Sequence, residues 1–481
     1  MISDDDRKVF EGFGWHVITI DGHNHSQIAK AYQEASQTIG RPTIIIARTV
    51  IGKGCATMED SFKTHGSPLP GEERRKTRDR LGLPADSDFH VDPQLIAHFQ
   101  KRWKNLSQSA QTWKNTLATK LKDHAFAASW DMRFGTLKPT MMPPIPWNRQ
   151  EALATRNAFG DIIKHWAPTL PALMGGSADL EPSNMTGGFA KAVGDFDRES
   201  RQGRNLNFGV REFPMSALCN GMALFGGIVP FDATFLSFAD YSRPALRLGA
   251  LQKVRVIHEF THDSFYLGED GPTHQPIEQL MSLRAIPDFY VMRPADPQET
   301  EVLMRHAVGL RYPSAFCLTR QKVPYLDLPT ATVDQAVRGA YVVWQSPALE
   351  NDASLKPDAL ILATGSEVSL AIAAAQGLGN QGSQGSAIKL RVISMPCWEL
   401  FLEQDKAYQD KILPPSVLRR ISLEAGVTLG WSRFVGLSGL TLGIDHFGTS
   451  APAEKLAEEY GFTPQAVMAQ IKSYLERFHH A

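Results

Sequence analysis

The chain has 481 residues, enough for two or three domains, and its 43% hydrophobic and 21% charged content is typical of soluble globular proteins. A formal net charge of −1 excludes a general nucleic-acid or membrane surface, which would need a basic excess. The acidic start and the lack of a long apolar run predict a cytoplasmic protein with neither a signal peptide nor a membrane span. Four widely spaced cysteines without a CxxC pair indicate reduced, mostly buried thiols: Cys55, Cys219, Cys317 and Cys397.

The first block of the chain alternates strands and helices. Short buried strands are expected at 15–20 and 43–47, with a helix between them at 26–36. Charged helical stretches follow, including an amphipathic one at 93–122. The segment 137–147 is rich in proline and methionine and predicts a linker, because proline fixes an extended path and removes a donor.

A second block runs from about residue 148 to about residue 328. Its helix starting at Pro297 has a good N-cap in Asp296. Strands and helices alternate throughout the block, which predicts a parallel sheet with helices on both faces. The expected helices and strands are 211–225 (helix), 226–231 (strand), 241–253 (helix), 254–260 (strand) and 314–319 (strand).

The third block starts near residue 358 with a buried strand, a glycine turn and a helix, followed by a strand at 390–395. The Gly-Ser turn at 363–367 is interpreted as a structural turn, since one short turn is weak support for an anion site. The low-complexity stretch 377–387 predicts a surface loop. The whole chain is therefore expected to be α/β, with consecutive open, mainly parallel-sheet domains.

The densest chemistry lies between residues 205 and 276. Glu212 is a lone acid between Arg211 and Phe213, and flat aromatic residues and a polar turn at 268–276 follow it. This pattern suggests a site for a flat heterocyclic cofactor beside a polyhydroxylated substrate. From the residues alone, simpler interpretations stay open: an acid that complements a helix start, an aromatic core stripe and a solvated turn.

Three motifs in this region resemble the transketolase family of thiamine-diphosphate enzymes: GVREF (209–213), GEDGPTHQP (268–276) and GGSADLEPSNMT (175–186). The resemblance extends over nearly the whole chain. It implies domains of the thiamine-diphosphate-binding type: a remnant of the diphosphate-binding domain at 1–136, a linker at 137–147, a pyrimidine-binding domain at 148–328, a linker at 329–357 and a C-terminal transketolase domain at 358–481.

The resemblance implies transfer of a two-carbon ketol unit from a ketose phosphate to an aldose phosphate, through a thiamine-bound carbanion, in the pentose phosphate pathway. The implied cofactors are thiamine diphosphate and Mg²⁺ or another divalent ion, and the implied assembly is a homodimer. Alternatives are a related thiamine enzyme, such as deoxyxylulose-phosphate synthase or dihydroxyacetone synthase, and a non-catalytic or split-subunit partner.

The resemblance also assigns residues around the cofactor. Glu212 would hydrogen-bond the pyrimidine ring and stabilise its imino form, which then takes a proton from the thiazolium carbon. Phe238 would stack on the aminopyrimidine, with Phe235 and Tyr241 lining the same pocket. Asp179 would lie near the cofactor and the subunit interface.

On the substrate side, the resemblance implies that Asp270 reads a sugar hydroxyl and that His274 lies beside the reacting carbon. His65 would contact both cofactor and substrate. Two guanidiniums, a hydroxyl and an imidazole suit a phosphate dianion. The residues that match the family's sugar-phosphate site are Arg156, Ser183, His262 and Arg320.

One family feature does not occur in the sequence: the GDG…N segment that carries the metal ligands for the diphosphate. We therefore expect that the front part of the diphosphate-binding domain is missing and that the metal ligands lie outside this chain. A truncated chain explains this best; a second polypeptide that supplies the missing half and a degenerate relative are the alternatives.

Overall fold

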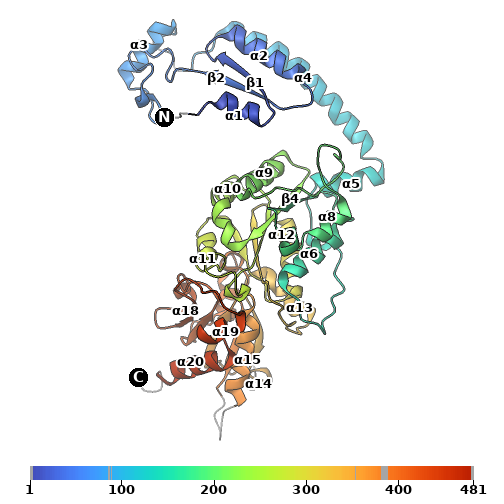
Figure 1. Ribbon diagram of the computed structural model, residues 1–481, viewed down its shortest axis with the longest axis vertical. Coiled ribbons are helices and arrows are strands. Elements are labelled where there is room, and N and C mark those ends of the chain that lie inside the picture. Colours follow the sequence, from blue (N-terminus) through green and yellow to red (C-terminus); the bar gives the residue numbers. More distant parts are fainter. Residues whose placement is uncertain (1–3, 85–86, 88, 353, 381–387, 478–481) are drawn as a thin grey trace. The chain divides into compact units, whose positions relative to one another are not determined.

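Figure 1 shows the computed structural model of the chain, which describes residues 4–84, 87, 89–352, 354–380 and 388–477. Contacts between residues divide the chain into two compact units, Met1–Leu117 and Ala118–Ala481. In the parts of the chain that are described, no helix is long and apolar enough to cross a membrane. The α/β architecture with mainly parallel sheets, predicted from the sequence, is confirmed.

The first unit is built around a two-stranded parallel sheet. Strand β1 (His16–Asp21) pairs with β2 (Thr43–Arg48), and helix α2 (His25–Gln37) connects the two strands. These elements confirm the predicted strand, helix and strand, but the expected burial was wrong, because β2 is half-buried to exposed and β1 has one buried residue, Val17. The unit also contains α1 (Asp6–Gly12), the 3-10 helix η1 (Phe62–Thr64), α3 (Gly71–Leu81) and most of α4 (Pro93–Lys120).

The second unit begins with a five-stranded sheet in the order β3-β4-β5-β7-β6, in which every neighbouring pair is parallel. Its strands are β3 (Leu173–Ser177), β4 (Val229–Phe235), β5 (Ile257–Thr261), β6 (Tyr290–Met292) and β7 (Ser314–Leu318). Its main helices are α6 (Thr155–Trp166), α9 (Glu212–Phe225), α10 (Ala239–Gln252) and α12 (Pro297–Gly309).

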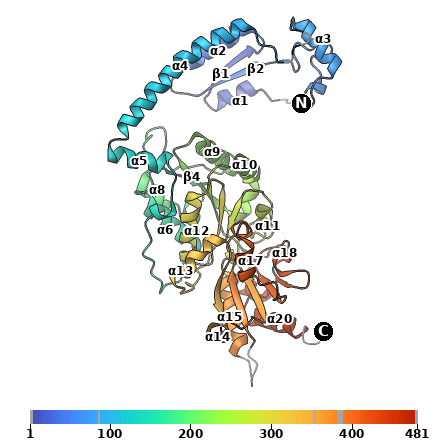
Figure 2. The ribbon, with the colours of Figure 1, turned by 180° about the vertical axis from the view of Figure 1, so that it is seen from behind.

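Helices cover both faces of this sheet, as the alternating pattern predicts. Helices α6 and α12 pack together, and so do α9 and α10 (Figure 2). On β7, Phe316 belongs to the core that contains residues of α6 and α12, whereas its neighbour Cys317 belongs to the core that contains residues of α10. Successive side chains of a strand point to opposite faces, so both faces are buried.

A second sheet in the same unit has the order β12-β11-β9-β10-β8, and only its edge strand β8 runs antiparallel to its neighbour. The strands are β8 (Tyr341–Gln345), β9 (Ala359–Ala363), β10 (Leu390–Ser394), β11 (Arg420–Leu423) and β12 (Leu440–Leu442). Helices α15 (Glu367–Asn380) and α20 (Pro464–Arg477) pack against each other.

The remaining elements of the second unit are short. They are α5 (His124–Phe134), η2 (Pro139–Met141), α7 (Glu181–Asn184), α8 (Gly187–Val193), η3 (Leu236–Phe238), η4 (Phe265–Leu267), α11 (Gln279–Arg284), α13 (Thr330–Val333), η5 (Asp334–Arg338), α14 (Pro347–Asn351), α16 (Trp398–Leu402), α17 (Lys406–Ile412), α18 (Ser432–Val435) and α19 (Ala453–Glu459).

The two sheets of the second unit share one hydrophobic core. Phe265, just after β5, packs edge-on against Tyr460 and Phe462 at ring-centroid distances of 5.2 and 5.3 Å. The proline-rich segment 137–147 also packs closely, because Trp147 Nε1 donates to Glu301 Oε2 of α12 at 2.7 Å. The second unit is therefore continuous across its two sheets.

Some local predictions were wrong. The strand expected at 226–231 lies at Val229–Phe235, because Gly226 and Gly227 both have positive φ and end the preceding helix instead. Of the loop expected at 377–387, residues 377–380 complete helix α15, and 381–387 lie outside the described residues.

Candidate functional site

The loops after β3, β4, β5 and β7 start from the same edge of the first sheet of the second unit, because parallel strands end at one edge. Four of the predicted site residues follow these strand ends. Asp179 follows β3, Phe238 follows β4, His262 follows β5 and Arg320 follows β7. The fold therefore gathers residues that are far apart in the sequence.

Glu212 is the first residue of α9, and the residue is only 9% exposed. Its backbone oxygen accepts a hydrogen bond from Ser242 Oγ of α10 at 2.9 Å, and Ser216 Oγ donates to Ser242 Oγ at 3.1 Å. These bonds fasten the start of α9 to the helix that carries Tyr241. The backbone of Glu212 is therefore fixed and the residue is largely dehydrated, so that a hydrogen bond from its carboxyl group to a ring nitrogen would be strengthened.

Five rings form one cluster beside the sheet edge. Phe235 and Phe238 lie 5.6 Å apart with an interplanar angle of 12°, and Phe235 stacks on His262 at 3.8 Å. Tyr241 lies 6.1 Å and His274 lies 5.4 Å from the ring of Phe238. Such a group of flat rings suits stacking on a flat heterocycle.

The three aromatic residues do not form the helical stripe that their spacing suggests. Phe235 ends strand β4, Phe238 ends the 3-10 helix η3, and Tyr241 lies in the first turn of α10. Phe235 is 7% exposed, whereas Tyr241 is 66% exposed. The chain bends sharply here, and the bend brings the rings together outside the regular core.

The turn 268–276 brings His274 into the ring cluster. Gly271 has φ 75°, a conformation that favours glycine, and the backbone NH of His274 donates to its carbonyl at 3.0 Å. Gln275 Nε2 donates to the carbonyls of Gly268 and Thr449 at 2.8 and 3.0 Å, which fixes the turn against the second sheet's loops. Asp270 lies on the exposed side of the same turn.

The residues predicted for the phosphate form a basic group. Arg156 Nη1 donates to the backbone oxygen of Ser183 at 2.8 Å, while Arg320 is exposed. Burial and the nearby charge of Arg320 lower the pKa of Arg156. Burial, followed by the charges of Arg156, Arg320 and His274, lowers the pKa of His262 to about 3. At neutral pH this group is two cations beside an uncharged imidazole, which attracts an anion.

Two predicted residues are not joined to this group. His65 belongs to the first unit, where it is exposed and its backbone NH donates to the carbonyl of Phe62 at 3.0 Å. Asp179 is exposed and has φ 61° in the turn after β3. Within the part of the chain that is described, no hydrogen bond links Asp179 to the ring cluster.

A set of titratable residues buried in the sheet was not predicted from the sequence. His258 Nδ1 on β5 lies 2.8 Å from Asp232 Oδ1 on β4, and both side chains are fully buried. Glu259, also on β5, is fully buried, and neither of its carboxylate oxygens has a hydrogen-bond partner among the described residues. Burial raises the pKa of Glu259 well above its ordinary value, although the charge of Arg156 opposes this. The sequence feature that could have indicated this group is an acid, Glu259, inside the segment 254–260, which was predicted to be a strand.

Replacing Glu259 with glutamine is expected to stabilise the protein at pH 8 and to have a smaller effect at pH 5. The pKa of Glu259 is higher in the folded state than its ordinary value of 4.5. The folded protein therefore loses stability as the pH rises above 4.5 and the unfolded chain gives up this proton first. Glutamine removes that loss, so the unfolding midpoint should rise by roughly 2–4 °C per kcal/mol regained. Scanning calorimetry at both pH values tests this, with Glu269→Gln as the exposed control. Equal midpoints of parental and variant chains at pH 8 would contradict it.

Within the described ranges, no group of three or more His, Cys, Asp or Glu residues is arranged to hold a metal ion. The described residues fit one part of the implied cofactor, because a buried acid, Glu212, and the stacked rings of Phe235 and Phe238 suit a flat, nitrogen-bearing heterocycle.

Three protein-family descriptions match the chain. "Transketolase, thiamine diphosphate binding domain" matches residues 1–134, "Transketolase, pyrimidine binding domain" matches 151–325, and "Transketolase-like TK C-terminal domain" matches 339–463. The first match does not support the expectation that the front part of the diphosphate-binding domain is missing.

Named relatives and solved structures agree with these matches. The chain is 43% identical to a transketolase of Geobacillus stearothermophilus over 97% of this chain and 69% of that protein. It is 40% identical to a chloroplastic transketolase of Craterostigma plantagineum over 98% of this chain and 90% of that protein. Its fold is similar to the structure of transketolase from Leishmania mexicana, with a TM-score of 0.88 and 34% identity over 99% of this chain and 69% of that one. A transketolase structure from Campylobacter jejuni gives a TM-score of 0.85 and 34% identity over 98% and 69%.

Proposed function

This chain belongs to the transketolase family and is a transferase of ketol groups, and we propose that the transfer takes place at the ring cluster beside Glu212. A two-carbon ketol unit passes from a ketose phosphate to an aldose phosphate, with thiamine diphosphate as the cofactor. The observation that carries the proposal is the placement of Glu212, which is 9% exposed and fastened to the helix that bears Tyr241.

In this proposal Glu212 holds the aminopyrimidine end of thiamine diphosphate. The bound cofactor supplies the carbon that accepts the ketol unit and stabilises the resulting negative charge. Glu212 shares a proton with a ring nitrogen and so sets the tautomer in which the ring's own amine is a base. Phe238 stacks on the ring, and Phe235 and Tyr241 line its sides, which the near-parallel rings of Phe235 and Phe238 support.

The sugar phosphate lies at the basic group. Arg156 and Arg320 bind the dianion, and Ser183 and the uncharged imidazole of His262 complete its surroundings. His274, which contacts Phe238, lies next to the reacting carbon, and Asp270 on the same turn reads a sugar hydroxyl. The roles of His65 and Asp179 stay predictions.

A divalent ion, Mg²⁺ by preference, accompanies the diphosphate in this proposal, because a group with several negative charges is costly to bind without one. The domain division proposed from the sequence has a pyrimidine-binding domain at 148–328 and a C-terminal domain at 358–481. Every assigned residue except His65 lies in the first of these.

A homodimer is the proposed assembly. Large apolar side chains are exposed on α9 and α10, including Phe225 at 89%, Leu251 at 67% and Leu224 at 57%. An exposed apolar group of this kind is typical of a protein interface.

The proposed location is the cytoplasm and the proposed pathway is the pentose phosphate pathway. The four cysteines, all buried free thiols, suit a reducing compartment.

The test supplies donors and acceptors in pairs to the chain with thiamine diphosphate and Mg²⁺. We expect two-carbon transfer from a ketose phosphate to an aldose phosphate, and little product with pyruvate as donor or formaldehyde as acceptor. Product with pyruvate or formaldehyde alone would favour deoxyxylulose-phosphate synthase or dihydroxyacetone synthase chemistry. No product with any pair would favour a non-catalytic partner. Chromatography of the sugar products distinguishes these outcomes.

A further inference from the structure

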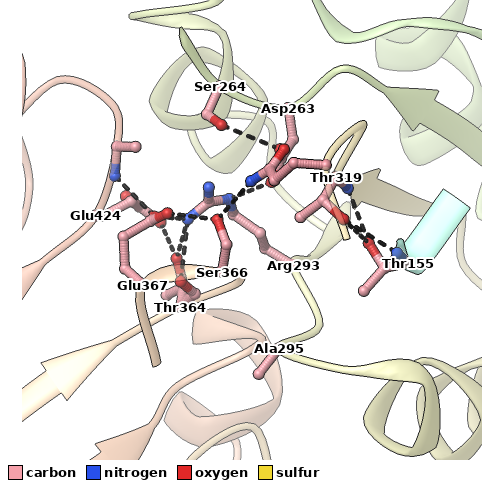
Figure 3. Close-up of polar contacts among 12 residues, drawn as sticks. Thr155, Asp263, Ser264, Arg293, Ala295, Thr319, Thr364, Ser366, Glu367 and Glu424 are labelled. Atoms are coloured by element: carbon pink, nitrogen blue, oxygen red, sulfur yellow. Dashed lines mark hydrogen bonds and ion pairs between the residues drawn. The ribbon is translucent and has the colours of Figure 1, made fainter. Parts of the chain in front are cut away.

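A buried polar network joins strand ends from both sheets of the second unit (Figure 3). Its centre is Arg293, which follows β6 and is fully buried. Arg293 Nε donates to Asp263 Oδ2 at 2.8 Å, and its Nη1 donates to Glu367 and, at 2.9 Å, to Thr364 Oγ1. One guanidinium therefore connects the segment after β5 with the start of α15.

The network continues on the side of the second sheet. Thr364 Oγ1 donates to Glu424 Oε1 at 2.6 Å, and Arg284 makes two hydrogen bonds of 2.8 Å to the carboxylate of Glu424. Asp263, Glu367 and Glu424 thus share two guanidiniums, all of them buried. Because the network is buried and most of its polar atoms are hydrogen-bonded, its side chains have few alternative geometries.

Each of the three residues with a basic or imidazole group proposed for the phosphate has a sequence neighbour that is fixed by hydrogen bonds. His262 precedes Asp263, which Arg293 holds. Arg320 precedes Gln321, whose Nε2 donates to Ser366 Oγ at 3.1 Å, and Ser366 Oγ donates to Glu367 Oε1 at 2.6 Å.

The third such residue, Arg156, follows Thr155. Figure 3 shows Thr155 paired with Thr319: the backbone NH of each donates to the other's hydroxyl, at 3.0 and 2.8 Å. Thr319 precedes Arg320, so this pair fixes the segments of both arginines relative to each other.

The backbone at His262 needs such anchors. His262 has φ 60°, an uncommon conformation for a residue with a side chain, and it persists only where neighbouring contacts hold it. The next residue supplies two of these contacts: Asp263 accepts from Arg293, and its backbone NH donates to the carbonyl of Leu318 at 3.2 Å.

The second sheet also fixes Arg293 closely. The backbone NH of Arg293 donates to the carbonyl of Pro396 at 2.8 Å, and the NH of Gly365 donates to the carbonyl of Arg293 at 3.0 Å. A Cβ atom at Gly365 would lie 2.7 Å from Arg293 Cζ, so only glycine leaves room for the guanidinium.

We propose that Arg293 is a positioning residue for the phosphate site, through which the second sheet of the unit holds His262 and Arg320 in the geometry that binds a sugar phosphate. Arg293 itself does not contact the substrate. The inference rests on the proposed function, because it assumes that the basic group binds the phosphate. It assigns the C-terminal sheet a direct part in substrate affinity.

The test is equilibrium binding by calorimetry, with ribose 5-phosphate and ribose as probes, on the full chain with thiamine diphosphate and Mg²⁺. Arg293→Met is expected to weaken binding of ribose 5-phosphate by about tenfold or more, a loss of the size that misplaced charged hydrogen bonds give. Binding of ribose should stay within about twofold. In assays of transfer, KM for the phosphorylated sugar should rise while kcat changes little.

Matched variants separate positioning from general stability. Arg284→Met removes the other buried guanidinium of the network, so it should lower the unfolding midpoint while leaving the preference for the phosphorylated probe unchanged. Arg293→Lys, which keeps the charge, should recover part of the lost affinity. Ser366→Ala removes two hydrogen bonds of one hydroxyl and no charged side chain, so it serves as the test variant if Arg293→Met does not fold. It should weaken binding of ribose 5-phosphate but not of ribose.

Unchanged affinity for ribose 5-phosphate in Arg293→Met, or in Ser366→Ala where Arg293→Met does not fold, would overturn the inference. Equal losses in Arg293→Met and Arg284→Met would overturn it too, since both would then reflect stability. A parental chain that does not prefer ribose 5-phosphate over ribose would instead overturn the phosphate site on which the inference rests.

Discussion

Glu212→Gln is expected to lower turnover by roughly 10²- to 10⁴-fold, the usual contribution of a positioned acid or base. Glutamine keeps the size of the side chain but cannot give up or take a proton at the ring nitrogen. Cofactor affinity should change little, because the stacking rings and the rest of the cofactor's contacts remain. Steady-state kinetics and calorimetry with thiamine diphosphate and Mg²⁺ measure the two effects separately.

The control is the same change at an exposed acid, Glu199→Gln, which should leave both quantities unchanged. If Glu212→Gln turned over at close to the parental rate, tautomer control by this residue would be ruled out. If turnover and cofactor affinity fell together, the carboxylate would be a binding group rather than a proton-transfer group.

Arg320→Ala is expected to raise KM for phosphorylated sugars by about 10- to 100-fold with little change in kcat, as loss of a charged contact made equally in ground and transition states would. Because Arg320 is exposed, the fold should not suffer. Lys322→Ala removes a positive charge two residues away and should have a much smaller effect. An unphosphorylated sugar should show the same KM in all three proteins.

An unchanged KM for Arg320→Ala would remove this residue from the phosphate site. A rise of equal size for Lys322→Ala would mean that the general positive field, rather than the specific contact, attracts the phosphate.

The regular elements were predictable because their signals are local. Asp296 and Pro297 mark a helix start, and in the structure Asp296 Oδ1 accepts from the backbone NH of Glu299 at 2.8 Å, as an N-cap does. The strands at 43–47 and 390–395 were equally clear, since their apolar runs are short and bounded by turns, although only the second of them is buried.

The site could be predicted only in part, because its geometry is tertiary. Motif resemblance identified His262 and His274, but not that both rings contact the Phe235 and Phe238 pair. No periodicity indicates that Arg293 reaches Asp263, 30 positions away, and Thr364, 71 positions away. The three-residue spacing of Phe235, Phe238 and Tyr241 suggested one helical stripe, but a strand, a 3-10 helix and an α-helix follow one another within these seven residues.

The role of Glu212 is tested most directly by the rate at which bound thiamine diphosphate exchanges its thiazolium proton for deuterium, followed by NMR. With the parental chain we expect exchange far faster than in the free cofactor, and with Glu212→Gln a return close to the free rate. Parental and variant chains that exchange at the same accelerated rate would contradict the claim that this buried carboxylate makes the ring amine a base.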